Sequence, residues 1–230
     1  MGKPASDPPR GEFRRGRARL WVEFVLIFAV APVVMAVALP PGWLFPALFG
    51  VTELGLVLLR RTPGFHWPDL LAGRRLLAQR GIWGVVLVFA ALTSAASLAV
   101  LLVMRPEALF FLPRHRPGLL LMILVLYPLL SALPQEILFR VLFFRRFGAL
   151  LPGVRGAIVL NGVLFSLAHL MYWSWIVSAM TFVGGLVFAW AYEVRQSFLL
   201  AVALHAVAGW ILFSLGMGVY FYAGNAVRPF

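Results

Sequence analysis

The chain has 230 residues, of which 62% are hydrophobic and only 12% are charged, and its formal net charge is +12. A soluble domain is nearer half apolar and a quarter charged, so this composition, with a mean hydropathy of +0.93, excludes an ordinary soluble protein and predicts an integral membrane protein. The basic residues lie between apolar segments, where they orient the chain and meet anionic lipid rather than nucleic acid. The absence of cysteine excludes disulfides, thiol catalysis and cysteine-ligated metals.

The apolar segments predict an all-α polytopic membrane protein with seven spans, and an eighth span stays open as an alternative. Residues 1–19 form a basic arm that we expect to be disordered and cytoplasmic, and the apolar segment behind it is too long for a signal peptide. The N-terminal membrane region, 20–117, contains predicted spans at 20–39, 42–59 and 82–104, and a short helix in the membrane interface at 70–77. The second region, 118–215, contains predicted spans at 118–147, 156–172, 175–192 and 198–215, and an aromatic interfacial tail occupies 216–230.

The fourth predicted span contains Pro134 in its interior. Proline removes a backbone donor and clashes with the preceding turn, so the segment is either one long kinked helix or two helices that meet at this residue. Basic residues are far more numerous in the loops that seven spans place beside the N-terminus. This bias predicts a cytoplasmic N-terminus and an external C-terminus in the plasma (inner) membrane.

Four Glu, Arg and His side chains lie away from the basic ends of the apolar segments in the second region: Glu136, Arg140, His169 and His205. Charged groups at membrane depth are costly and therefore indicate function by default. Glu136 and Arg140 are four residues apart and share a helix face, so the guanidinium can keep the carboxylate ionised. The alternative is an ion pair that only locks helices, with histidines that are ordinary buried residues.

A depth estimate relates these residues to the basic ends of their spans. At about 1.5 Å per residue, Glu136 and His205 lie at depths that agree within one turn. His169 lies deeper, and joins them only if its helix is tilted or starts later. The spacing permits the three side chains to meet and does not require it.

Three motifs occur in order on successive spans: Gln135 to Arg140, Phe165 to His169, and His205 to Gly209. Across 118–215 the chain resembles the CAAX-processing and bacteriocin-processing intramembrane proteases, in which Glu-Glu-x-x-x-Arg, Phe-x-x-x-His and His-x-x-x-Asn lie on core helices. The resemblance implies a four-helix catalytic bundle in which the acidic pair and the first histidine activate water. The later histidine and asparagine stabilise the oxyanion. Gln135 and Gly209 depart from this pattern, because they replace the first glutamate and the asparagine.

The resemblance implies an intramembrane peptidase that cleaves a membrane-associated peptide or protein tail. We expect Glu136 to be the general base, paired with His169. Arg140 would hold the carboxylate, His205 would polarise the carbonyl, and Gln135 would position water or substrate. We expect membrane lipid and a peptide or protein substrate as partners, with no nucleic acid and no cofactor, although Glu136, His169 and His205 form a plausible zinc set as the alternative.

Two other functions stay open. Gln135 and Gly209 are compatible with a catalytically inactive scaffold or immunity-type protein of the same fold. A small proton-coupled transporter is less favoured, because the first half of the sequence shows no repeat in the second. Among the remaining polar residues, we expect Asn161 to hydrogen-bond a neighbouring helix and Glu23 and Glu53 to face helix interfaces. Gly184 and Gly185 are expected to allow close helix packing.

Overall fold

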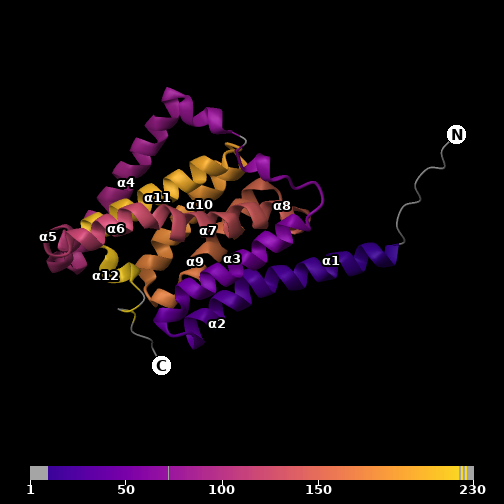
Figure 1. Ribbon diagram of the computed structural model, residues 1–230, viewed down its shortest axis with the longest axis horizontal. Helices are drawn as coiled ribbons and strands as arrows, with labels where there is room; N and C mark the ends of the chain where they lie inside the picture. The colour runs from indigo at the N-terminus through magenta and orange to yellow at the C-terminus, as the bar shows by residue number, and fades with distance from the viewer. Residues whose placement is uncertain (1–9, 72, 223, 225, 227–230) are drawn as a thin grey trace.

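The computed structural model describes residues 10–71, 73–222, 224 and 226, and every regular element among them is helical (Figure 1). Seven of these helical stretches are long and apolar enough to cross a membrane, which confirms the all-α polytopic prediction. Their bounds are Gly16–Ala38, Pro41–Arg60, Arg80–Met104, Pro117–Leu150, Val154–Tyr172, Trp175–Glu193 and Phe198–Leu215. The described part of the predicted tail adds only the four-residue helix α12, Gly218–Phe221.

The first span begins earlier than predicted. Helix α1 covers Arg10–Val25 and continues through a π-helical turn, Leu26–Val30, into α2, Ala31–Ala38. The described residues of the expected disordered arm, 10–19, are therefore helical, and residues 1–9 lie outside the described part of the chain. Extending a formed helix costs much less than starting one, so the apolar span carries helix into the basic segment. Arg19 and Glu23 support this extension with an ion pair of 2.8 Å across one turn.

The second and third spans are joined by a loop that is not a single short helix. A 3₁₀ turn, Pro41–Trp43, leads into α3, Leu44–Arg60, and α4 covers Arg80–Met104. The loop between them holds two 3₁₀ helices, Trp67–Leu71 and Arg74–Ala78, rather than the expected helix at 70–77. Gly73 separates them because its φ of +76° lies in the left-handed region, which interrupts a right-handed helix.

The fourth span is one continuous, irregular helix, so the alternative of a break at Pro134 is wrong. Short elements, Pro106–Ala108 and α5, Phe111–His115, precede it. It then runs through α6, Pro117–Tyr127, the π segment Pro128–Ala132, α7, Leu133–Glu136, a second π segment, Ile137–Leu142, and α8, Phe143–Phe147, before a 3₁₀ turn, Gly148–Leu150. The wider π turns accommodate the missing proline donor without ending the helix.

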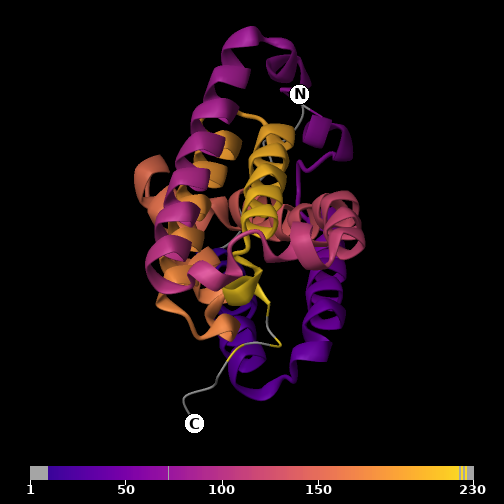
Figure 2. The ribbon, with the colours of Figure 1, turned by 90° about the vertical axis from the view of Figure 1, so that its left-hand side faces the viewer.

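The last three spans pack against this helix. They are α9, Val154–Ala168, extended by a 3₁₀ turn at Leu170–Tyr172, then α10, Trp175–Glu193, and α11, Phe198–Leu215. Helix α4 lies along α11 (Figure 2). A Cβ atom on Gly185 would lie only 2.9 Å from Gly162 Cα, so the prediction of close packing is confirmed for Gly185, whereas a Cβ atom on Gly184 would meet only Phe188 of its own helix.

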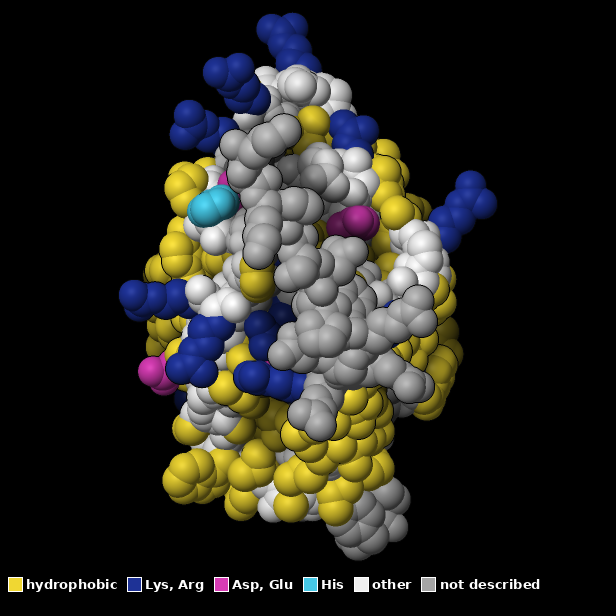
Figure 3. Space-filling view, turned by 90° about the vertical axis from the view of Figure 1, so that its right-hand side faces the viewer, with side chains coloured by type: hydrophobic (Ala, Val, Ile, Leu, Met, Phe, Trp, Pro, Cys, Tyr) yellow, Lys and Arg dark blue, Asp and Glu magenta, His cyan; other side chains and the backbone are white. Residues whose placement is uncertain are grey.

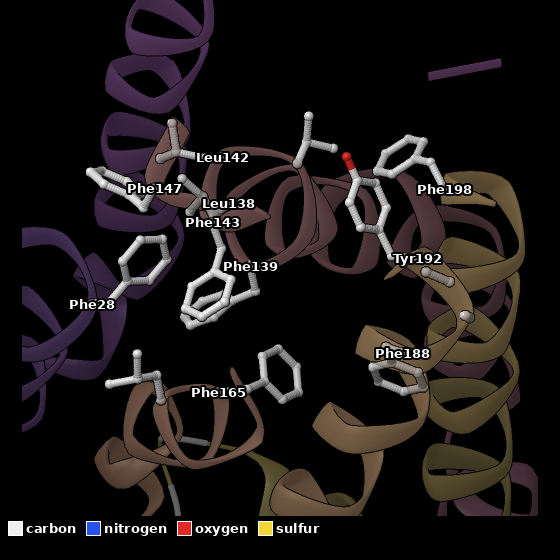
Figure 4. Close-up of a cluster of buried hydrophobic side chains, with 14 of the residues drawn as sticks. Phe28, Leu138, Phe139, Leu142, Phe143, Phe147, Phe165, Phe188, Tyr192 and Phe198 are labelled. Carbon is white, nitrogen blue, oxygen red and sulfur yellow. The ribbon is translucent and has the colours of Figure 1, made fainter. Parts of the chain in front are cut away.

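A phenylalanine cluster joins the first span to the long helix (Figure 4). Phe28 meets the rings of Phe139, Phe143 and Phe147 at centroid distances of 5.4 to 5.8 Å. At the end of the molecule beyond this cluster, Arg146 reaches Glu23 at 2.7 Å, and arginine side chains gather on the surface (Figure 3). Glu23 thus faces a helix interface as expected, but the prediction for Glu53 is wrong, because Glu53 is exposed on α3.

Candidate active site

The centre of the second region is a fully buried ion pair. Glu136 ends α7, and Arg140 lies one turn later in the second π segment, with 0% of either side chain exposed. Arg140 Nε lies 2.9 Å from Glu136 Oε2, and Arg140 Nη2 donates to Glu136 Oε1 at 3.4 Å. Burying two charges costs more than their attraction returns unless further hydrogen bonds satisfy both groups.

Two other helices supply those hydrogen bonds. His205 of α11 donates from Nδ1 to Glu136 Oε1 at 2.9 Å. Asn161 of α9 accepts a hydrogen bond from Arg140 Nη1 through its Oδ1 and donates through Nδ2 to the carbonyl of Phe139. Three helices are therefore held together by one polar network, which we call the buried network: Glu136, Arg140, Asn161 and His205.

Aromatic rings enclose the buried network. The guanidinium of Arg140 lies 4.9 Å from the Phe165 ring centroid and 5.7 Å from that of Phe188. His205 stacks on Phe188 at 4.8 Å with an interplanar angle of 13°. Figure 4 shows Phe165 and Phe188 on facing helices. These rings exclude water and attract the cation through their faces, so the electrostatic contacts inside are stronger than on a surface.

A cavity of about 650 Å³ lies beside the buried network, between the first two spans and the long helix. Its walls are mainly apolar, and its polar side chains include Tyr127, Ser131, Gln135 and His169. Gln135 Nε2 donates to Ser131 Oγ at 2.9 Å, and His169 Nδ1 donates to the carbonyl of Phe165 at 2.7 Å. Neither Glu136 nor His205 is among the described residues that line this cavity.

The predicted site residues thus fall into two groups. Glu136, Arg140 and His205 meet in the buried network, whereas Gln135 and His169 face the cavity. The expected pairing of Glu136 with His169 is not a contact in this structure, in which Glu136 hydrogen-bonds His205 instead. The reason is local: α9 ends at Ala168, and His169 at its C-terminus bonds back to its own helix.

The alternative zinc set, Glu136, His169 and His205, is not grouped in this arrangement. Glu136 and the Nδ1 atom of His205 already bind each other, and His169 belongs to the other group. Across the described part of the chain, no three His, Cys, Asp or Glu side chains are grouped as metal ligands.

Two residues of the site, Asn161 and Tyr127, are not predicted as site residues from the sequence. Asn161 bonds a neighbouring helix as expected, but it is also the partner that completes the hydrogen bonding of Arg140. The sequence motifs do not include Tyr127. Its spacing of four residues from Ser131, and of four more to Gln135, is the signal that places all three on one face of the long helix.

Comparison with known proteins agrees with the motifs. Residues 117–211 match the model of a family described as type II CAAX prenyl endopeptidase Rce1-like. The match confirms the resemblance to the CAAX proteases, and it spans all the residues of the buried network as well as Gln135 and His169. No curated protein and no solved structure matched the chain.

Proposed function

We propose that the chain is an intramembrane endopeptidase without a metal, because residues 117–211 match the Rce1-like family of CAAX endopeptidases. Its substrate is a membrane-associated peptide or protein tail that enters the cavity beside the long helix. The proposal depends most on the cavity, which places Gln135 and His169 in a mainly apolar chamber between helices that are long and apolar enough to cross a membrane. A chamber of this kind accepts an apolar peptide and offers a few polar groups to orient it.

His169, rather than Glu136, is the general base in this proposal. Its Nδ1 donates to the Phe165 carbonyl, so Nε2 carries the lone pair and can accept a proton. Glu136 is excluded from the cavity, and its oxygens are engaged by Arg140 and His205. A base must reach the proton that it removes, and His169 has this access.

The reaction then proceeds in two steps. The oxygen of a cavity water forms a bond to the scissile carbonyl carbon while its proton moves to His169 Nε2. The C–N bond of the tetrahedral intermediate then breaks, and the leaving amine takes that proton from Nε2. Gln135 orients the substrate through its amide, and the buried network fixes the helices that form this wall of the cavity.

The first test compares two histidines with the same local bond. His115 Nδ1 also donates to a carbonyl four residues earlier, but it lies on the exposed helix α5. Purified wild type, His169→Ala and His115→Ala are incubated in nanodiscs with a library of apolar membrane peptides, and products are identified by mass spectrometry. We expect His169→Ala to lose about 10²- to 10⁴-fold in cleavage rate, His115→Ala to match wild type, and a zinc chelator to change nothing. Cleavage by His169→Ala at the wild-type rate would refute the assignment.

A second candidate function is an inactive scaffold of the same fold, and Gln135 favours it, because an amide cannot accept a proton as a carboxylate does. Gln135→Glu separates the two candidates, since it places a carboxylate in the cavity. For a working peptidase we expect cleavage by wild type and faster cleavage by this variant at neutral pH, with the gain lost as the new carboxylate protonates at low pH. If wild type cleaves no peptide and Gln135→Glu does, the wild-type protein is an inactive scaffold that lacks the carboxylate needed as a base.

A further inference from the structure

We propose that Tyr127 is a further catalytic residue of this site, and that its phenol donates a hydrogen bond to the oxygen of the scissile carbonyl as negative charge develops there. The inference rests on the proposed peptidase function and deepens it. It assigns the donor at a position where Gly209 offers no side chain.

Tyr127 occupies the space beside Gly209. A Cβ atom on Gly209 would lie 2.1 Å from Tyr127 Cε1 and 2.4 Å from Tyr127 Cζ, and these distances are too short for atoms that are not bonded to each other. The hydroxyl oxygen is one covalent bond beyond Cζ. The polar end of the phenol therefore lies at the place from which a longer side chain at position 209 would act.

Neighbouring rings hold the phenol in this orientation. The Tyr127 ring meets His205 edge-to-face at 5.9 Å and Phe213 at 5.8 Å. Tyr127 lines the cavity, whereas His205 lies behind it and is only 4% exposed. A substrate in the cavity thus meets the phenol of Tyr127 rather than the imidazole of His205.

The phenol lines the cavity together with Ser131 and Gln135, and Gln135 Nε2 donates to Ser131 Oγ at 2.9 Å. The Tyr127 hydroxyl is therefore available to a substrate in the cavity, where a hydrogen-bond donor in a water-poor site is most effective at stabilising an oxyanion.

The decisive variant is Tyr127→Phe, which removes one oxygen and keeps the ring against Gly209 and His205. We expect the kcat for the cleaved peptide to fall by about 10²- to 10³-fold, with KM changed less than threefold and the melting temperature unchanged. Tyr220→Phe, outside the cavity, is the matched control and should retain wild-type kinetics. A kcat for Tyr127→Phe within threefold of wild type would overturn the assignment.

A swap tests the shared space directly. Tyr127→Ala should lose activity. The double variant Tyr127→Ala, Gly209→Asn should cleave at least tenfold faster than Tyr127→Ala, because the asparagine amide enters the space that the ring has left. If Tyr127→Ala does not fold, the kcat of Tyr127→Phe alone decides whether the phenol is a donor. A folded double variant no more active than Tyr127→Ala counts against a donor role at this point.

A binding measurement separates this inference from the peptidase proposal. The probe is an apolar peptide that carries a phosphonate in place of one amide, since its anionic oxygens mimic the oxyanion. We expect Tyr127→Phe to weaken phosphonate binding at least tenfold and binding of the parent peptide less than threefold. If wild type binds the phosphonate in this way but cleaves nothing, the peptidase proposal fails and the donor role stands. If wild type neither cleaves peptides nor prefers the phosphonate, both fail.

Discussion

Among single residues, the charged groups at the centre of the molecule lie against one another, and Arg140 Nε and Glu136 Oε2 form an ion pair of 2.9 Å without a hydrogen bond. Arg140 is fully buried, and its charge is met by one carboxylate, one amide oxygen and two aromatic faces. Removing one partner leaves another buried polar group without a hydrogen bond, either to the protein or to water. The resulting loss of stability is larger than the net stabilisation that the hydrogen bond provides. The stability of this region therefore depends on each member of the buried network.

Asn161→Leu tests this dependence with a change of similar size. The substitution leaves Arg140 Nη1 without its amide acceptor and the Phe139 carbonyl without its donor. We expect the free energy of unfolding to fall by about 1.5–3 kcal/mol, measured by chemical unfolding in detergent. Val159→Leu is the control, because Val159 lies on the same helix and is 51% exposed, and it should change stability by less than about 0.5 kcal/mol. Equal stability of Asn161→Leu and wild type would contradict the role given to this residue.

At the scale of helices, two features set the shape of the site. The π segments before and after α7 change the rotation of the long helix, and with it which side chains face the cavity and which face α9 and α11. Gly162 and Gly185 bring α9 and α10 into backbone contact, which places Phe165 and Phe188 around Arg140. The site is thus formed by helix geometry as much as by its polar residues.

Two adjacent glycines provide a matched test of this packing. A Cβ atom on Gly185 would meet backbone at 2.9 Å, whereas the nearest atom to a Cβ on Gly184 lies 3.4 Å away on the ring of Phe188. We expect Gly185→Ala to lower the free energy of unfolding by about 1–3 kcal/mol through overpacking. Gly184→Ala should be neutral or stabilising, because alanine favours helix by up to about 1 kcal/mol. Thermal unfolding of both variants in the same detergent checks the difference in sign, and equal behaviour would argue against tight packing of α9 on α10.

For the whole molecule, the N-terminal spans and the family segment form one packed unit. Phe24 and Phe28 of the first span contact Phe143 and Phe147 of the long helix. Arg146 also binds Glu23, the Leu58 carbonyl and Thr62, so it ties the first two spans to the end of the long helix. The first two spans therefore supply one wall of the cavity, although they lie outside the matched family segment.

The orientation of this unit in the membrane is open to a direct measurement, because the chain has no cysteine. The distribution of basic residues predicts that the loop with Arg75 is cytoplasmic and the loop with Glu107 external. A membrane-impermeant maleimide should label Arg75→Cys only in inverted vesicles and Glu107→Cys only in intact cells. The cysteine-free wild type gives the background. The reverse labelling pattern would place the N-terminus outside.

The sequence by itself determined the membrane class, the approximate spans and the pairing of Glu136 with Arg140. These features depend on local hydropathy and on residues four apart, so they need no knowledge of distant contacts. It also indicated that Glu136 and His205 share a depth and that His169 lies deeper. The exposed position of Glu53 and the helical state of residues 10–19 did not follow, since both depend on what surrounds the segment.

Only the tertiary structure decided which histidine meets Glu136, that Gln135 and His169 face a cavity, and that Tyr127 fills the space beside Gly209. Each of these contacts depends on how the long helix is rotated relative to its neighbours. That rotation is set by two π turns and by close packing between α9 and α10, and neither is encoded in the spacing of polar residues along one span. A motif therefore located the site on the chain, and packing determined the direction in which each of its side chains points.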